Sequence, residues 1–210
     1  ITHAHVEGNS STAIQCSDAT VFFDHLTFGN TGRPYLMLER SSFVVQNCVF
    51  PSATGRFELI HADGGIKAGG RGLFLRNFFG APRAGYTDVI DFTGCNRPGP
   101  IVEFINNVFV GATDDVLDFA GTDAWVEGNI FLHAHRNGSP NSSSAVSGGS
   151  NAGRTSEFTV IGNIFYDVDQ AATAKQGNFF TLINNTIVRQ TRVGGMDSDA
   201  AVVNFADPGA

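Results

Sequence analysis

The chain has 210 residues, of which 42% are hydrophobic and 16% are charged, with 25 glycines and 19 phenylalanines. This length fits one domain or one elongated repeat array, and the hydrophobic content excludes a disordered chain. The formal net charge is −7 and no basic run is present, which excludes nucleic acid as a partner because phosphate binding depends on clusters of lysine and arginine.

Short apolar segments separated by polar turns recur along the chain. They lie at residues 43–45, 73–75, 102–105, 124–126 and 158–161. Short runs rich in Val, Ile and Phe and bounded by Gly, Asn and Asp are typical of β-strands. The long Leu/Ala/Glu/Lys runs that build amphipathic helices are missing, so we predict an all-β protein.

An asparagine phrase that ends in Phe or Ile follows most of these segments. Its copies begin at Asn77, Asn107, Asn129, Asn163 and Asn185, at spacings of 30, 22, 34 and 22 residues, and looser copies surround residues 25 and 47. A base period of 22 with about three short strands per repeat is typical of a right-handed parallel β-helix. We therefore predict a single β-helix domain of about seven coils over residues 1–210, in which Asn forms a hydrogen-bonded ladder and Phe stacks in the core.

Two Gly- or Ser-rich stretches are predicted to be loops on this solenoid, at residues 62–72 and, as a long insertion, at 134–154. Loops on a rigid scaffold are where binding residues usually lie. Lys67, Arg71 and Arg154 fall in them and are candidates for binding sugar carboxylates. The alternative is that they are solvated turn residues.

The stretch 113–121 places three carboxylates within five residues, at Asp114, Asp115 and Asp118. A near copy one repeat earlier aligns Asp88 with Asp115 and Asp91 with Asp118. Because side chains alternate along a strand, Asp91 and Asp118 should point outward, and neighbouring strands about 4.8 Å apart would bring them within reach of one cation. Such oxygen ligands suit calcium, so we predict a calcium site at Asp91 and Asp118 with Asp114, Asp115 and Asp88 as further candidate ligands, and a solvated acidic edge as the alternative.

This pattern, Asp-Asp-x-x-Asp on one coil with an Asp on the previous coil and a lysine on a later one, resembles the family 9 polysaccharide lyases, which include pectate lyases. In that family four aspartates bind calcium and the lysine is the Brønsted base. The resemblance covers about residues 85–180. It implies Asp91, Asp114, Asp115 and Asp118 as calcium ligands and Lys175, two coils beyond Asp118, as the base.

The implied reaction is β-elimination on a uronate-containing glycan. Calcium on the uronate carboxylate acidifies the C5 proton, and the base removes this proton as the C4 oxygen leaves. We expect a calcium-dependent lyase acting on an acidic polysaccharide, with Lys175 as base and Lys67 as a fallback. The alternative is a non-catalytic β-helix module that binds glycans or serves as a stalk or adhesin in a larger surface protein.

The histidines offer further candidates. His61 lies in the acidic column and is a candidate metal ligand or acid/base group, since imidazole titrates near neutrality. His133 and His135 are two residues apart and would share a strand face as zinc ligands do, but no third ligand is suitably spaced. We therefore assign these two to substrate binding from a loop.

The cysteines and the chain ends complete the predictions. Cys16, Cys48 and Cys95 are expected to be buried free thiols, with a Cys16–Cys48 bridge as the alternative. The first residues form no signal peptide, and neither end of the sequence offers a cap for the terminal coil. We therefore expect a mature form or a piece of a longer protein. The lyase hypothesis predicts a secreted or cell-surface bacterial protein that is monomeric. The sequence contains no apolar run of 18 residues, so we predict no membrane span.

Overall fold

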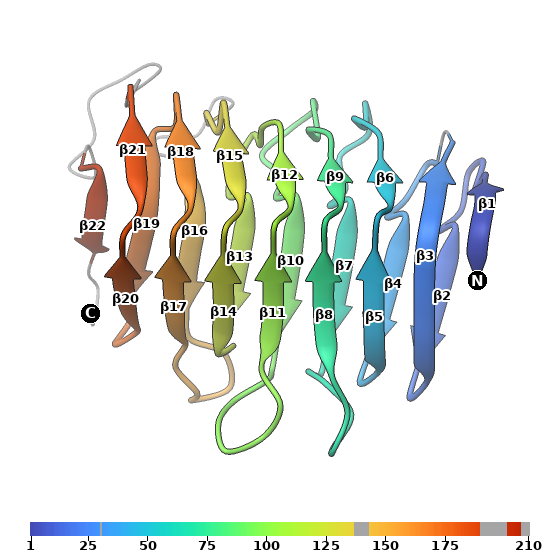
Figure 1. The fold of residues 1–210 in the computed structure, drawn as a ribbon, viewed down its shortest axis with the longest axis horizontal. Coiled ribbons are helices and arrows are strands. Elements are labelled where there is room, and N and C mark those ends of the chain that lie inside the picture. Colours follow the sequence, from blue (N-terminus) through green and yellow to red (C-terminus); the bar gives the residue numbers. More distant parts are fainter. Residues whose placement is uncertain (30, 137–142, 190–200, 207–210) are drawn as a thin grey trace.

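The structure is a computed structural model that describes residues 1–29, 31–136, 143–189 and 201–206. The described residues form 22 strands and no helix, and the strands stack in parallel as a solenoid of about seven turns. The predicted all-β, parallel β-helix fold is confirmed. In Figure 1 successive coils follow one another along the long axis, from β1 (Thr2–Val6) at one end of the stack to β22 (Val203–Ala206) at the other.

Most coils contribute one strand to each of three faces. The first face holds β5 (Ser42–Gln46), β8 (Gly72–Leu75), β11 (Val102–Ile105), β14 (Ala124–Glu127), β17 (Glu157–Ile161) and β20 (Phe179–Ile183). The second holds β6 (Val49–Phe50), β9 (Phe78–Phe79), β12 (Val108–Phe109), β15 (Ile130–Leu132), β18 (Ile164–Tyr166) and β21 (Thr186–Val188). The long strand β3 (Thr20–Phe28) belongs to both and also pairs with β1 (Thr2–Val6).

The third face lies behind the other two in Figure 1. It holds β2 (Ile14–Ser17), β4 (Leu36–Glu39), β7 (Ile60–Asp63), β10 (Ile90–Thr93), β13 (Leu117–Ala120), β16 (Ser144–Gly149), β19 (Gln170–Lys175) and β22 (Val203–Ala206). This face carries the acidic stretch.

The corner between the first and second faces is built by the predicted asparagine ladder. Asn107 donates from its side-chain amide to Asn129 Oδ1 at 3.0 Å, and Asn129 donates in the same way to Asn163 Oδ1 at 3.0 Å. The residue before each ladder position has a positive φ, which turns the chain sharply, as at Asn106 (φ 55°). In the looser copy Cys48, not Asn47, occupies the ladder register, and its amide donates to Asn77 Oδ1 at 2.9 Å.

The core behind this corner is a column of stacked rings. Successive centroids are 4.7 to 5.0 Å apart along the series Phe28, Phe50, Phe79, Phe109, Phe131 and Phe165. Stacked pairs of this kind contribute about 0.5–1.5 kcal/mol each beyond the burial of their area. The three cysteines are buried free thiols, as predicted, and the alternative Cys16–Cys48 bridge does not form.

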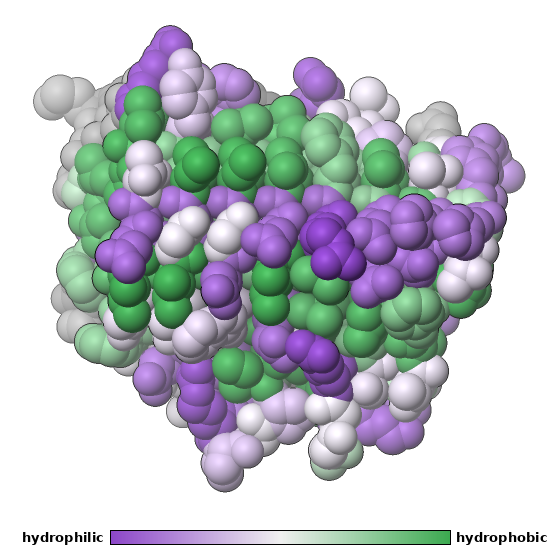
Figure 2. All heavy atoms as spheres, in the orientation of Figure 1, coloured by the Kyte–Doolittle hydropathy of each residue, from purple (hydrophilic) through white to green (hydrophobic). Residues whose placement is uncertain are grey.

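The outer surface of the first and second faces differs from that of the third. Figure 2 shows a hydrophilic band along the long axis with hydrophobic rows on both sides of it. One such outward row on the second face, in register from strand to strand, is Val49, Phe78, Val108, Ile130 and Ile164. On the third face the outward positions are mostly polar, so the chemistry of the chain is concentrated there.

The predicted insertion at 134–154 contains a strand. Residues Ser144–Gly149 form β16, which is buried throughout and pairs with β13 and β19. Small residues resemble a loop in sequence, but here they fit a crowded position, since a Cβ on Gly148 would lie 2.5 Å from Phe158 Cε1. Residues 137–142 of the predicted insertion lie outside the described residues.

Candidate functional site

The two strand aspartates lie where the sequence predicts. Asp91 on β10 and Asp118 on β13 are direct partners in the parallel ladder. The residues beside them in each strand are fully buried, whereas the two aspartates are half-buried and outward. The same register continues to His61 on one side and to Ser147 and then Thr173 on the other.

A close group of carboxylates lies on the same two coils, in the segments that lead into these strands. Oxygen atoms of Asp88, Asp114 and Asp115 all lie within 4.8 Å of one another. Backbone hydrogen bonds fix them in place. The Asp115 amide donates to Asp88 Oδ1 at 2.9 Å, and the Ser144 amide donates to Asp115 Oδ1 at 2.7 Å.

Asp91 does not join this group. Its Oδ2 lies 3.4 Å from His61 Nδ1, and the same imidazole nitrogen lies 4.0 Å from Glu58 Oε2. Asp88, which the sequence also offered as a candidate ligand, is the aspartate of this coil that lies beside Asp114 and Asp115. The alignment of the two repeats offered both aspartates and the resemblance implied Asp91, whereas the turn before β10 directs Asp88 toward the Asp114–Asp115 pair.

The carboxyl groups of these aspartates are largely buried and lie close to one another. Burial, followed by repulsion from neighbouring carboxylates, raises the pKa of Asp88 well above its usual value and raises the pKa of Asp114 to about 8. The same two causes raise the pKa of Asp118 to about 7, and burial raises the pKa of Asp115. A cluster of oxygens that repel one another in this way fits a hard dication such as calcium, which would favour their ionised forms.

Lys175 is brought to this cluster although two coils separate it from Asp118. Burial lowers the pKa of Lys175, but Asp115, Asp118, Asp114 and Asp88 together raise it above its usual value. Within the described residues Lys175 forms no ion pair at 4.0 Å or less. It therefore lies within electrostatic reach of the aspartates without pairing directly to one of them.

The strand β16, which lies between β13 and β19, provides the space for the Lys175 side chain. The register that pairs Ala120 with Gly149 and Gly148 with Ala174 places Gly149 between Ala120 and Lys175. Lys175 Cε lies 3.7 Å from the point where a Cβ on Gly149 would stand. Gly149 and Ala120 thus leave the space into which the lysine side chain reaches back.

Three site residues were not identified from the sequence. Tyr86 hydrogen-bonds to Asp114 and thereby favours its ionised form. Ser144 is buried and its amide holds Asp115, and Ser147 is buried in register with Asp118. The serines carry no motif, and for Tyr86 the only clue is its place two residues before Asp88.

The other predicted site residues lie elsewhere. Lys67 Nζ donates to the Asp18 carbonyl at 3.1 Å, so the structure does not bring this fallback base to the aspartates. Arg71 forms a bidentate pair with Glu103, both contacts at 3.1 Å, on the first face. Arg154 lines a cavity of about 600 Å³ together with Arg97 and Glu157.

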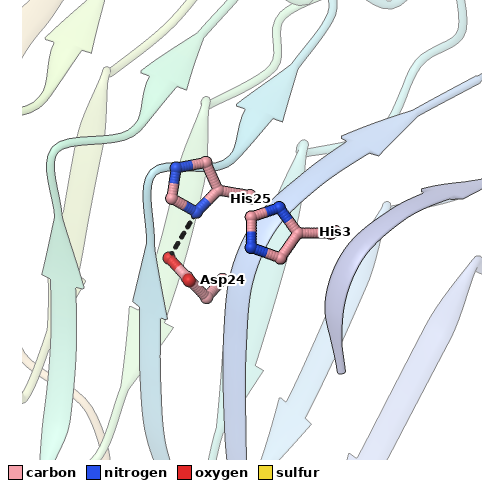
Figure 3. A group of neighbouring side chains, drawn as sticks. All are labelled: His3, Asp24 and His25. Carbon is pink, nitrogen blue, oxygen red and sulfur yellow. Dashed lines mark ion pairs between the residues drawn. The ribbon is translucent and has the colours of Figure 1, made fainter.

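The histidines form two groups with carboxylates away from the main cluster. His133 and His135 meet Asp167 and Asp169 at the corner after the second face. A second group joins His3, Asp24 and His25 near the N-terminus, where Figure 3 shows His25 directed at Asp24 with the His3 ring beside it. His25 Nδ1 lies 2.9 Å from Asp24 Oδ1.

Comparisons with known proteins add no relative. No family model, no curated protein and no solved structure matches the chain. The part of the chain that the structure describes contains no helix long and apolar enough to cross a membrane. The geometry of the third face is therefore the basis on which a function can be proposed.

Proposed function

We propose that the chain is a calcium-dependent polysaccharide lyase that cleaves a uronate-containing glycan by β-elimination. The observation that carries this proposal is the convergence of Asp88, Asp114, Asp115 and Asp118 with Lys175 on one face. The enzyme would encounter a polysaccharide outside the cell, so we also propose that the protein is secreted or located at the cell surface. We further propose that it acts as a monomer.

The aspartates supply the oxygen ligands. Asp88, Asp114 and Asp115 would hold the ion, with Asp118 beside them on β13. When bound, calcium would neutralise a uronate carboxylate and make the adjacent C5 proton more acidic. Backbone amides already hold Asp88 and Asp115, so little reordering is needed.

Lys175 is the base in this proposal. It must be neutral to accept the C5 proton, and the aspartate charges oppose this by raising its pKa. Burial has the largest single influence on this pKa and acts in the opposite direction. Once the aspartate charge is balanced, burial is left to lower the pKa of Lys175 toward the range where a lysine serves as a base.

The test is cleavage of polyuronates, read as absorbance of the unsaturated product, in calcium and in EDTA. Lys175→Ala should lower kcat by at least about 100-fold, because positioned proton transfer contributes about 10²–10⁴. Lys67→Ala is the matched control and should retain wild-type activity, since Lys67 hydrogen-bonds far back along the chain to Asp18. If calcium binds but no polyuronate is cleaved, the passive glycan-binding module is the better account.

A further inference from the structure

A second cluster of ligands lies at the corner that follows the second face. His133 comes directly after β15 and Asp167 directly after β18, and the preceding pair Leu132 and Tyr166 are partners in the ladder. Both residues have positive φ, 55° for His133 and 57° for Asp167. The two coils therefore turn in the same way at this point and place the two side chains side by side.

The nitrogen and oxygen atoms of this cluster converge. His133 Nδ1 lies 2.9 Å from Asp167 Oδ2, and His135 Nε2 lies 3.6 Å from the same oxygen. His133, His135 and Asp167 each offer one ligand atom, and these atoms all lie within 4.8 Å of one another. A zinc ion with bonds of about 2.0–2.2 Å to nitrogen and oxygen would bridge such separations with small side-chain adjustments.

A second layer of contacts orients these ligands. Asp169 has a fully buried carboxylate whose Oδ1 lies 2.9 Å from His135 Nδ1. Donation from Nδ1 to Asp169 leaves the lone pair on Nε2, the nitrogen that faces Asp167. Asp169 is itself fixed, because its Oδ2 accepts from the Arg136 amide at 3.2 Å.

The two oxygens of Asp167 have separate neighbours. Oδ2 faces the two imidazoles, whereas Oδ1 lies 3.6 Å from Arg189 Nε. Oδ2 is therefore the oxygen that an ion between the two imidazoles would meet, while the arginine compensates the charge at the other oxygen. The His133 side chain is 50% exposed, so a fourth position is open to water.

We propose that His133, His135 and Asp167 form a zinc site, held in geometry by Asp169 and separate from the aspartate cluster on the third face. Two imidazoles and one carboxylate are ligands that zinc accepts, with water in the fourth position. The ion would link two neighbouring coils, since His133 and His135 follow β15 and Asp167 follows β18. This role replaces the substrate-binding role predicted for the two histidines.

The cluster of His3, Asp24 and His25 provides an internal control. Its two rings are stacked, 4.7 Å apart at an angle of 14°, so their in-plane nitrogens run parallel and do not point at one atom (Figure 3). Asp24 is already occupied by Asn47, whose side chain donates to it at 2.8 Å. Both histidines are exposed, and among the described residues no fully buried carboxylate orients them as Asp169 orients His135.

The test is titration of the whole chain with Co²⁺ as a visible probe, then displacement by Zn²⁺, with calcium in excess to occupy the aspartate cluster. The wild type should bind one Co²⁺ with the absorption of a four-coordinate ion. The double variant His133→Ala/His135→Ala should lose this band, and Asp169→Asn should weaken binding by about 10- to 100-fold. His3→Ala/His25→Ala should bind as the wild type does.

Two results would overturn the proposal. One is a wild type that binds no more Co²⁺ or Zn²⁺ than the His133/His135 variant does. The other is loss of binding in the His3/His25 variant with retention in the His133/His135 variant. Circular dichroism in EDTA checks that each variant is folded, and polyuronate cleavage is not used as a readout, so this proposal and the lyase proposal stand or fall separately.

Discussion

The Cε atom of Lys175 lies 3.7 Å from the point where a Cβ on Gly149 would stand. This relationship explains how a lysine two coils away from Asp118 comes within electrostatic reach of the aspartates. Because Gly149 on the intervening strand β16 has no side chain, the side chain of Lys175 can extend across the outer surface of that strand. Gly149 is therefore a positioning residue for the proposed base.

We predict that Gly149→Val lowers kcat on polyuronate by about 10- to 100-fold while calcium affinity stays unchanged. The γ carbons of valine would occupy the space of Lys175 Cε, and a displacement of about 1 Å can cost about 100-fold in rate. Gly149→Ala is the matched control, because its Cβ would make an ordinary 3.7 Å contact. Equal activity in all three proteins would show that Lys175 is not positioned by this glycine.

Substitution of the neighbouring Gly148 by alanine should affect the free energy of unfolding differently from the same substitution at Gly149. A Cβ on Gly148 would lie 2.5 Å from Phe158 Cε1, so Gly148→Ala should destabilise the protein by about 1–3 kcal/mol, the usual cost of overpacking a core. Gly149→Ala should be neutral or stabilising by up to about 1 kcal/mol, because it reduces the freedom of the unfolded chain. Urea unfolding of the two variants measures the difference, and equal stabilities would contradict the packing described for β16.

The pair of His61 and Asp91 predicts a pH dependence. The hydrogen bond to Asp91 raises the pKa of His61, so the folded state holds this proton more tightly than the unfolded state does. The pair therefore stabilises the protein fully below pH 6.5, the usual value for histidine, and this contribution is lost as pH rises through the folded pKa.

NMR titration of the His61 ring measures this shift directly. In Asp91→Asn the pKa of His61 should fall, and the part of the stability that is lost above pH 6.5 should shrink. His135, whose pKa is raised by Asp169, serves as an internal reference that Asp91→Asn should leave unchanged. An unshifted His61 in Asp91→Asn would show that another group controls its protonation.

The repeat architecture was predictable because it depends on spacing alone. The asparagine period and the phenylalanines that follow it define the corner and the core column, and the ladder at Asn107, Asn129 and Asn163 follows from them. The register of Asp91 against Asp118 was predictable for the same reason, since both occupy equivalent strand positions.

The site was less predictable because it depends on turns and on packing between coils. The sequence offered both Asp88 and Asp91 as ligands and could not rank them, because it is the turn before β10 that brings Asp88 to the Asp114–Asp115 pair. The path of Lys175 depends on Gly149, which looks like part of a loop in sequence. Asp167 could not be matched to His133 from spacing, because the coil between them contains an insertion.

The most direct test of the central claim is calcium titration by calorimetry at pH 8 on the wild type, Asp88→Asn and Asp91→Asn. Each variant replaces one carboxyl group by an amide on the same coil, but of the two aspartates it is Asp88 that groups with Asp114 and Asp115, with oxygens within 4.8 Å of one another. We predict that calcium binds the wild type, that Asp88→Asn weakens binding by at least about tenfold, and that Asp91→Asn stays within about threefold of the wild type, a difference of less than 1 kcal/mol. Absence of calcium binding in the wild type, or a loss confined to Asp91→Asn, would contradict the site described here.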